Sequence, residues 1–133
     1  MDDMTQAINF LSKVKGIDVP NGTIKPWGRE IKWADMKGKY TGKILYIRKG
    51  KRLSKQYHKS KVESMMVLFG TLYLEYKDKM LVLNTGQSID IPCGTIHRPI
   101  AIDTDVTILE ISTWDDGDVV RLDDDYGRSC ATV

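Results

Sequence analysis

Two hydrophobic patterns divide this chain. Apolar residues recur at helical spacing from Met4 to Val14 and Gly16 supplies a stop signal, so this stretch predicts one short N-terminal helix. Later segments alternate apolar and polar residues and are rich in Ile, Val, Leu, Tyr and Thr: "GKILYIRKG", "MMVLFGTLYLEY", "KMLVLNTG", "QSIDIP" and "DVTILEIST". Short strands at this spacing indicate an all-β sandwich or barrel. The segments "FGTLY" and "YKDKM" predict tight hairpin turns, with Gly70 and Asp78 supplying the turn geometry.

Composition narrows the class of protein. The chain has 133 residues, 41% of them hydrophobic and 29% charged, which is typical of one soluble domain. A net charge of +2 gives no argument for nucleic acid or membrane partners, and no apolar run approaches a membrane span. The two cysteines, Cys93 and Cys130, form no CxxC pair, and the N-terminus has no signal peptide pattern. We therefore expect reduced thiols and a cytoplasmic location.

The chain contains only two histidines, His58 and His97, and each has suggestive neighbours. Gln56 and His58 point to the same face of a strand because side chains alternate. If Lys59 to Lys61 form a turn, Glu63 opens the partner strand and faces His58 across a hairpin. His97 follows a Pro-x-Gly turn at the end of another strand. Such an amide, carboxylate and imidazole set fits a divalent metal, with Zn²⁺ first and Mn²⁺, Fe²⁺, Co²⁺ or Ni²⁺ as alternatives.

At this point the chain resembles the cupins. "GKRLSKQYHKSKVESMMVLFG" and "GQSIDIPCGTIH" are similar to the two cupin motifs. The ordered set "KPWGRE", "GKILYIRKGKRLSKQYH", "IPCGTIHRP", "ILEIST" and "DVVRLDDDYGR" resembles type II mannose-6-phosphate isomerases. The resemblance implies a cupin double-stranded β-helix, or jelly-roll barrel, over residues 24–128. Residues 1–23 would then form the helix and a linker, and residues 129–133 a tail.

Several positions depart from the family pattern. Ser60 replaces the second histidine of the first motif, Lys61 replaces an arginine, Ser64 and Met65 replace His-Trp, and Ala101 replaces an asparagine. A looser resemblance to zinc-dependent type I isomerases implies that four residues suffice as metal ligands: Gln56, His58, Glu63 and His97. In a chain of this length we expect no preceding nucleotidyltransferase domain and no guanylyl transfer.

The implied reaction is the isomerisation of mannose 6-phosphate to fructose 6-phosphate through an enediol. Such a reaction needs a base, a Lewis acid and cations that hold the phosphate. The candidate catalytic residues are Glu110 and Lys43, and the candidate phosphate ligands are Lys43, Arg98 and Arg128. Glu110, a carboxylate on an apolar strand, is the candidate base, although it could instead orient a metal ligand or pair with Lys43.

Two other functions stay open at this level. A non-catalytic cupin that binds a sugar or nucleotide sugar would explain the departures at Ser60, Ser64 and Ala101, which we expect around the pocket. An iron-dependent dioxygenase could use His58, Glu63 and His97 as a two-histidine, one-carboxylate triad. The resemblance also makes a homodimer our default expectation.

Overall fold

The structure, a computed structural model, describes residues 6, 22–114 and 117–131. Apart from Gln6, the predicted N-terminal helix lies outside the described residues. The described residues form strands whose bounds are β1 (Thr23–Lys25), β2 (Gly28–Met36), β3 (Tyr40–Ile47), β4 (Lys55–His58), β5 (Glu63–Phe69), β6 (Leu72–Tyr76), β7 (Lys79–Leu83), β8 (Ser88–Ile91), β9 (His97–Ile100), β10 (Val106–Thr113) and β11 (Val119–Asp123).

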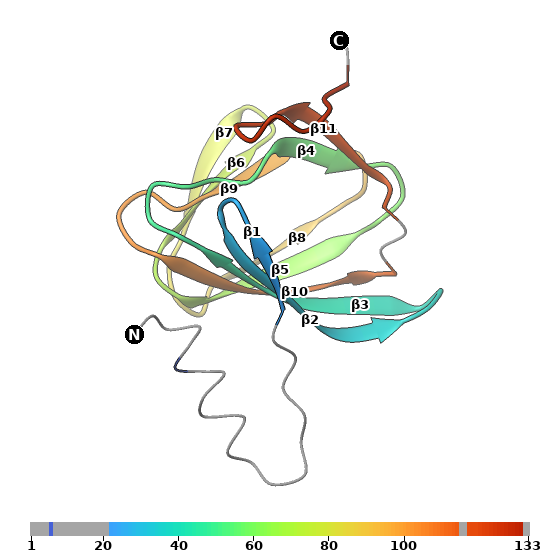
Figure 1. Cartoon of the computed structure of the whole chain (residues 1–133), viewed down its shortest axis with the longest axis horizontal. Helices are drawn as coiled ribbons and strands as arrows, with labels where there is room; N and C mark the ends of the chain where they lie inside the picture. Colours follow the sequence, from blue (N-terminus) through green and yellow to red (C-terminus); the bar gives the residue numbers. More distant parts are fainter. Residues whose placement is uncertain (1–5, 7–21, 115–116, 132–133) are drawn as a thin grey trace, which may run out of the picture.

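These strands form two antiparallel sheets that face each other, as Figure 1 shows. The six-stranded sheet has the order β1-β2-β3-β10-β5-β8, and the five-stranded sheet has the order β11-β4-β9-β6-β7. The predicted all-β, two-sheet architecture is therefore confirmed. No helix within the described residues has the length and apolar character to cross a membrane.

One predicted hairpin is correct and the other is wrong. β6 pairs with β7 from Tyr76 opposite Lys79, so "YKDKM" is a tight turn, in which Lys77 rather than Asp78 adopts a positive φ of 56°. "FGTLY" instead joins β5 to β6, which belong to different sheets. Gly70 is needed there because a Cβ atom would lie 2.2 Å from the Asp105 carbonyl oxygen. Gly70 thus lies in a connection that crosses from one sheet to the other.

The register of β10 with its neighbours divides the interior into an apolar part and a polar part. Ile108 lies opposite Leu45 on β3 and Val67 on β5, and all three are buried. Two residues further along the same inward face, Glu110 lies opposite Lys43. Buried aliphatic side chains stabilise the fold by about 1.5–3 kcal/mol each, whereas buried charges destabilise it unless they are paired. The polar part therefore calls for a functional explanation.

Candidate metal centre and cavity

Three predicted ligands come from three strands. His58 ends β4 and His97 begins β9, and these strands are neighbours in the five-stranded sheet, with Gln56 opposite His97 in register. Glu63 begins β5 in the facing sheet. The predicted hairpin between His58 and Glu63 is therefore wrong, because residues 59–62 cross from one sheet to the other. Glu63 reaches the histidines across the interior instead.

The ligand atoms of His58, Glu63 and His97 all lie within 4.8 Å of one another, and all three side chains are buried. Glu63 Oε1 is 2.9 Å from His97 Nε2 and 3.8 Å from His58 Nε2. None of these three atoms has a hydrogen-bond partner of acceptable geometry among the described residues. Buried polar atoms without partners are rare and costly, and each one calls for a reason. A divalent cation bound by two imidazoles and a carboxylate supplies that reason, so the residues fit a metal.

A hydrogen bond at Nδ1 orients each imidazole ring so that its Nε2 faces Glu63. His97 Nδ1 lies 2.9 Å from the Thr95 carbonyl oxygen, and His58 Nδ1 lies 3.0 Å from Asp118 Oδ1. Both oxygens only accept hydrogen bonds, so each Nδ1 is the donor and each Nε2 is left for a ligand. Burial lowers the pKa of His58, which favours the neutral ring that metal binding requires.

Two further buried groups lie beside the triad. Lys61 is only 4% exposed, and its Nζ is 3.4 Å from Glu63 Oε2 and 3.5 Å from Glu110 Oε1. Burial and the neighbouring Glu63 carboxylate raise the pKa of Glu110 well above its usual range. Burial opposes ionisation of Glu63 too, but a hydrogen bond from Glu110 and the charge of Lys61 hold its pKa well below the usual range. Glu63 is thus an ionised candidate ligand, and Glu110 is a neutral acid.

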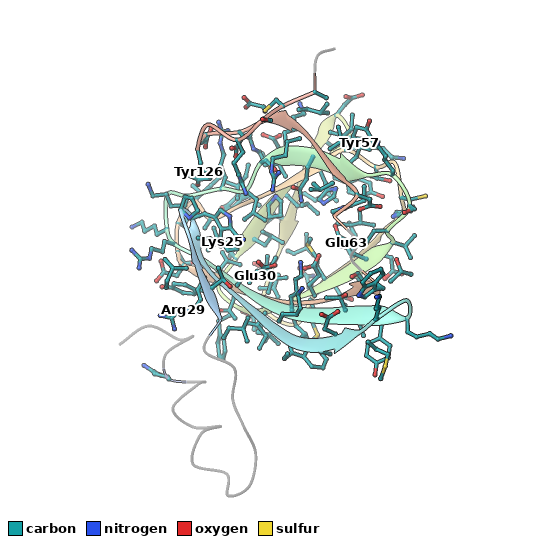
Figure 2. All side chains as sticks on the ribbon, turned by 45° about the vertical axis from the view of Figure 1, so that its right-hand side comes forward. Lys25, Arg29, Glu30, Tyr57, Glu63 and Tyr126 are labelled. Atoms are coloured by element: carbon teal, nitrogen blue, oxygen red, sulfur yellow. The ribbon has the colours of Figure 1, made fainter. Side chains whose placement is uncertain are left out.

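A cavity of about 170 Å³ lies beside this cluster. His58, Gln56, Lys61 and Glu110 line it, and Glu63 contacts two of them, His58 and Lys61. Five cationic side chains border the cavity: Lys25, Lys43, Lys61, Arg121 and Arg128. Only two carboxylates, those of Glu30 and Glu110, border it as well. Figure 2 labels Lys25 and Glu30, on β1 and β2, and Glu63, at the start of β5. This excess of positive charge suits an anionic ligand.

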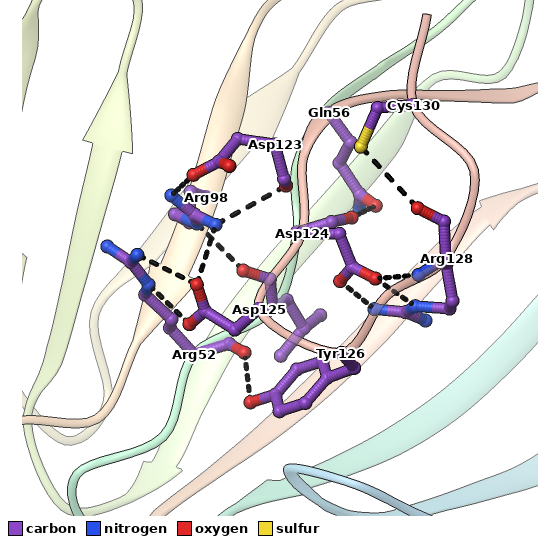
Figure 3. Close-up of polar contacts among 11 residues, drawn as sticks. Arg52, Gln56, Arg98, Asp123, Asp124, Asp125, Tyr126, Arg128 and Cys130 are labelled. Carbon is purple, nitrogen blue, oxygen red and sulfur yellow. Dashed lines mark hydrogen bonds and ion pairs between the residues drawn. The ribbon is translucent and has the colours of Figure 1, made fainter.

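The predicted phosphate residues have different surroundings. Lys43 and Arg128 line the cavity, but Arg98 is not among the lining residues. Because His97 points inward, its neighbour Arg98 points to the other side of β9. There Arg98 is 3% exposed, donates from Nε to the Leu53 carbonyl oxygen at 2.8 Å and from Nη1 to Asp123 Oδ2 at 3.0 Å. Figure 3 shows this network, in which Arg98 joins β9 to the end of β11. We therefore remove Arg98 from the phosphate set.

The remaining cations differ in their pairing. Arg128 makes a two-pronged contact with Asp124, from Nη2 at 2.8 Å and from Nε at 3.0 Å. Lys43 Nζ lies 2.9 Å from Glu30 Oε1. Although burial opposes it, the hydrogen bond and charge of Lys43 hold the pKa of Glu30 below its usual value. Arg121 Nε, by contrast, is buried and has no hydrogen-bond partner among the described residues.

Of the five departures from the family pattern, Lys61 and Met65 line the cavity, whereas Ser60, Ser64 and Ala101 do not, contrary to the expectation for these three. Ser60 Oγ donates to Asp118 Oδ2 at 2.9 Å, and Ser64 Oγ donates to Asp90 Oδ1 at 2.7 Å. Ala101 is fully buried. None of Ser60, Ser64 and Ala101 is among the lining residues. Gln56 does line the cavity, and its Oε1 accepts a hydrogen bond from Ser54 Oγ at 2.8 Å.

Sequence reasoning missed four residues of this region: Asp118, Lys61, Arg121 and Glu30. Asp118 is one of six aspartates between Asp115 and Asp125, a pattern that is usually a solvated surface, and the sequence analysis assigned Lys61 to a turn. Arg121 offered a usable signal, because it shares the segment "DVVRLDDDYGR" with the predicted Arg128.

The fold and the site together define a cupin. Staphylococcus aureus capsular polysaccharide assembling protein CapF superposes with a TM-score of 0.69 at 15% identity, over 84% of this chain and 34% of that chain. A cupin-2 domain containing protein from Shewanella frigidimarina has a TM-score of 0.56 at 24% identity, over 81% of this chain and 95% of that chain. At these identities, the likeness concerns the fold alone.

Within the cupins, the chain belongs to the family described as "Mannose-6-phosphate isomerase C-terminal", whose model matches residues 15–124. The alginate biosynthesis protein AlgA of Pseudomonas aeruginosa is 32% identical over 109 residues, which is 79% of this chain and 22% of AlgA. The mannose-1-phosphate guanylyltransferase ManC of Salmonella typhimurium is 31% identical over 108 residues, or 78% of this chain and 22% of ManC. The chain thus spans about a fifth of the length of these relatives.

Proposed function

We propose that this chain is a metal-dependent phosphosugar isomerase that converts mannose 6-phosphate to fructose 6-phosphate. One observation carries the proposal. Three buried candidate ligand atoms without hydrogen-bond partners, on His58, Glu63 and His97, lie beside a cavity with five cationic and two acidic side chains. Membership of the isomerase C-terminal family favours a sugar phosphate as the anionic ligand.

His58, Glu63 and His97 would hold the metal, with Gln56 on the same cavity wall as a proposed fourth ligand. Zn²⁺ is our first choice, and Mn²⁺, Fe²⁺, Co²⁺ and Ni²⁺ accept the same nitrogen and oxygen donors. When bound, a divalent cation supplies Lewis acidity that stabilises negative charge on the sugar oxygens.

The chain's own residues would carry the proton. Aldose–ketose conversion removes a proton from C2, returns one to C1 and moves a hydroxyl proton from O2 to O1. Glu110 is the proposed proton carrier, because it borders the cavity and its raised pKa keeps it protonated: it would donate its proton to one sugar atom and, once ionised, accept a proton from another. Lys61 contacts the same carboxyl group, and Lys43 faces it in register, so two ammonium groups stand beside the proposed site of proton transfer.

The phosphate would bind to Lys43, Arg121 and Arg128. Arg121 joins the set because its buried Nε has no partner among the described residues, and an anion would supply one. Burial and the nearby charge of Arg128 lower the pKa of Arg121, so a bound anion would stabilise its charged form. A dianionic phosphate would compensate both guanidinium groups.

A metal-resolved assay tests this function. The protein is stripped with a chelator, reloaded separately with Zn²⁺, Mn²⁺ or Co²⁺, and assayed with mannose 6-phosphate and with mannose. We expect activity with the phosphorylated sugar only, and none in the stripped protein. Arg121→Ala should weaken mannose 6-phosphate binding by about tenfold to a hundredfold, since a charge-assisted hydrogen bond contributes about 1.5–3 kcal/mol, while metal content stays the same. Equal binding of the two sugars would refute a phosphosugar substrate.

The alternatives lose part of their support. The sugar-binding cupin was motivated by losses expected at the pocket, yet Ser60, Ser64 and Ala101 do not line the cavity. The triad also suits an iron dioxygenase, but five cations around the cavity favour an anionic sugar, and oxygen consumption by the Fe²⁺-loaded protein would reveal that activity. The homodimer and the cytoplasmic location stay predictions.

A further inference from the structure

Asp118, which directly precedes β11, contacts four polar groups with one carboxylate. Its Oδ1 lies 3.0 Å from His58 Nδ1. Its Oδ2 accepts hydrogen bonds from Ser60 N at 2.8 Å, Ser60 Oγ at 2.9 Å and Lys61 N at 2.8 Å. Asp118 therefore joins a metal-ligand candidate to the segment that crosses between the sheets.

The chemistry of these contacts fixes the state of His58. Asp118 Oδ2 accepts three hydrogen bonds, from two N–H groups and one O–H group, so it carries no proton. At neutral pH Asp118 is thus a carboxylate, which can only accept, and His58 Nδ1 must carry the proton. The other nitrogen, Nε2, then presents its lone pair toward Glu63, at 3.8 Å from Oε1.

We propose that Asp118 is a positioning residue that holds His58 as the Nδ1–H tautomer. The lone pair of His58 Nε2 is then available to a metal before the metal binds. The same carboxylate holds residues 60 and 61 next to the start of β11. The proposal rests on the metal site of the proposed function and not on its substrate. Ser60, which replaces the second motif histidine, acts in this arrangement as a partner of Asp118. The same contact places Lys61, whose Nζ approaches Glu63.

Asp118→Asn is the sharpest substitution because it keeps the size of the side chain. If the amide oxygen faces His58, the amide nitrogen meets the N–H groups of Ser60 and Lys61, which are donors themselves. If the amide nitrogen faces His58, it donates to Nδ1, and the proton moves to Nε2, which can then no longer bind a metal. We expect the second arrangement, because the amide oxygen then still accepts from the N–H groups of Ser60 and Lys61. Ser60→Ala is the matched control, since it removes one bond to the same carboxylate and leaves the contact with His58 intact.

Two measurements test the proposal. The first is two-bond ¹H–¹⁵N correlation NMR of the metal-free protein, in which the two histidines give a simple spectrum. We expect His58 as the Nδ1–H tautomer in the wild type and in Ser60→Ala, and a loss of that tautomer in Asp118→Asn. His97, whose Nδ1 donates to the Thr95 carbonyl, should stay unchanged and is the internal control.

The second measurement is Zn²⁺ affinity by competition with a chromophoric chelator. Loss of the partner of a ligand histidine should weaken binding by about 10- to 100-fold in Asp118→Asn, and by less than about threefold in Ser60→Ala. An Nε2–H tautomer of His58 in the wild type, or unchanged Zn²⁺ affinity in Asp118→Asn, would overturn the proposal. If Asp118→Asn fails to fold, the tautomer of His58 in the wild type still tests the proposal. A correct tautomer in a chain that binds no metal would refute the proposed function while the state of His58 stands.

Discussion

At the scale of single residues, the most informative pair is Glu63 and Glu110, because their environments push their pKa values apart. Glu63 is the ionised ligand candidate, and Glu110 is the neutral acid that donates a hydrogen bond to it. Two roles for Glu110 follow from this arrangement: it can orient Glu63, or it can exchange protons with the sugar. These roles respond differently to substitution.

Glu110→Gln separates them. Glutamine keeps an N–H donor for Glu63, so Zn²⁺ affinity should stay within about threefold of the wild type. It can neither release nor take up a proton, so kcat should fall by about 10²- to 10⁴-fold, the usual contribution of a general acid–base group. Steady-state kinetics at matched metal content check this. A kcat within a few-fold of the wild type would leave Glu110 with an orienting role only.

The metal-free protein should also lose stability in mild acid because of His58. Burial lowers the folded-state pKa of His58 below the ordinary value of 6.5, so the unfolded chain binds more protons as pH falls through 6.5. The free energy of unfolding should therefore be larger at pH 7.5 than at pH 5.5 in the presence of a chelator. Urea denaturation at the two pH values measures this, and His58→Gln should reduce the difference. An equal difference in His58→Gln would assign the effect to other groups.

At the scale of secondary-structure elements, strand β9 shows how one alternation separates chemistry from structure. His97 faces the site, and Arg98, the next residue, pairs with Asp123 and the Leu53 carbonyl oxygen on the other side of the strand. We predicted that both residues would lie at the cavity because they are adjacent in one motif. Alternation along a strand forbids that when the first of the two is already directed inward.

Arg98→Met should therefore affect stability and leave ligand affinity unchanged. Removing a buried guanidinium that makes charge-assisted bonds should cost about 1–3 kcal/mol in the free energy of unfolding. Arg52→Met is the control, since Arg52 makes a comparable contact with Asp125 at 2.7 Å but on the exposed surface, where the cost should be about 0–1 kcal/mol. Chemical denaturation gives both values. If Arg98→Met instead weakens sugar phosphate binding at unchanged stability, Arg98 belongs to the cavity after all.

The elements also show which parts of the fold can be predicted from sequence. Strands are predictable because alternation and β-branched residues report local burial, and this information lies within each segment. Whether two strands form a hairpin or cross between sheets is not local. Gly70 supplies a positive φ in either case, and the close approach of Asp105 that explains it comes from a distant part of the chain.

In the candidate site, too, the residues fixed by local sequence could be predicted and those brought together by distant contacts could not. The ligand set His58, Glu63 and His97 was predictable because metal chemistry restricts the residue types, and the chain offers only two histidines. Asp118 and Lys61 could not be predicted, because charged residues are common on surfaces. Only the pairing of β11 with β4 brings Asp118 to His58. Arg121 was missed although it lies opposite Gln56 in that same pairing.

At the scale of the whole molecule, the candidate metal site draws its residues from both sheets. His58 and His97 belong to the five-stranded sheet and Glu63 to the six-stranded sheet. A cation bound by all three would hold the sheets together and would bind the folded chain in preference to the unfolded one. Metal binding should therefore stabilise the entire barrel.

Thermal unfolding can measure this stabilisation. At a free Zn²⁺ concentration 100 times Kd, binding contributes about 2.7 kcal/mol, which corresponds to an increase in Tm of roughly 5–15 °C for a domain of this size. Glu63→Gln should abolish most of the increase. A Tm that is independent of Zn²⁺ in the wild type would mean that the three ligand atoms are brought together for another reason.

Metal binding and isomerisation can be tested together in one measurement. Mannose 6-phosphate labelled with ¹³C at C2 is incubated with the Zn²⁺-loaded wild type and with Glu63→Gln, and ¹³C NMR follows the label without any coupling enzyme. The proposed function predicts that the label appears at the ketose carbon of fructose 6-phosphate with the wild type and stays in the aldose with Glu63→Gln. Stoichiometric Zn²⁺ in the wild type, with all of the label still in mannose 6-phosphate, would contradict it.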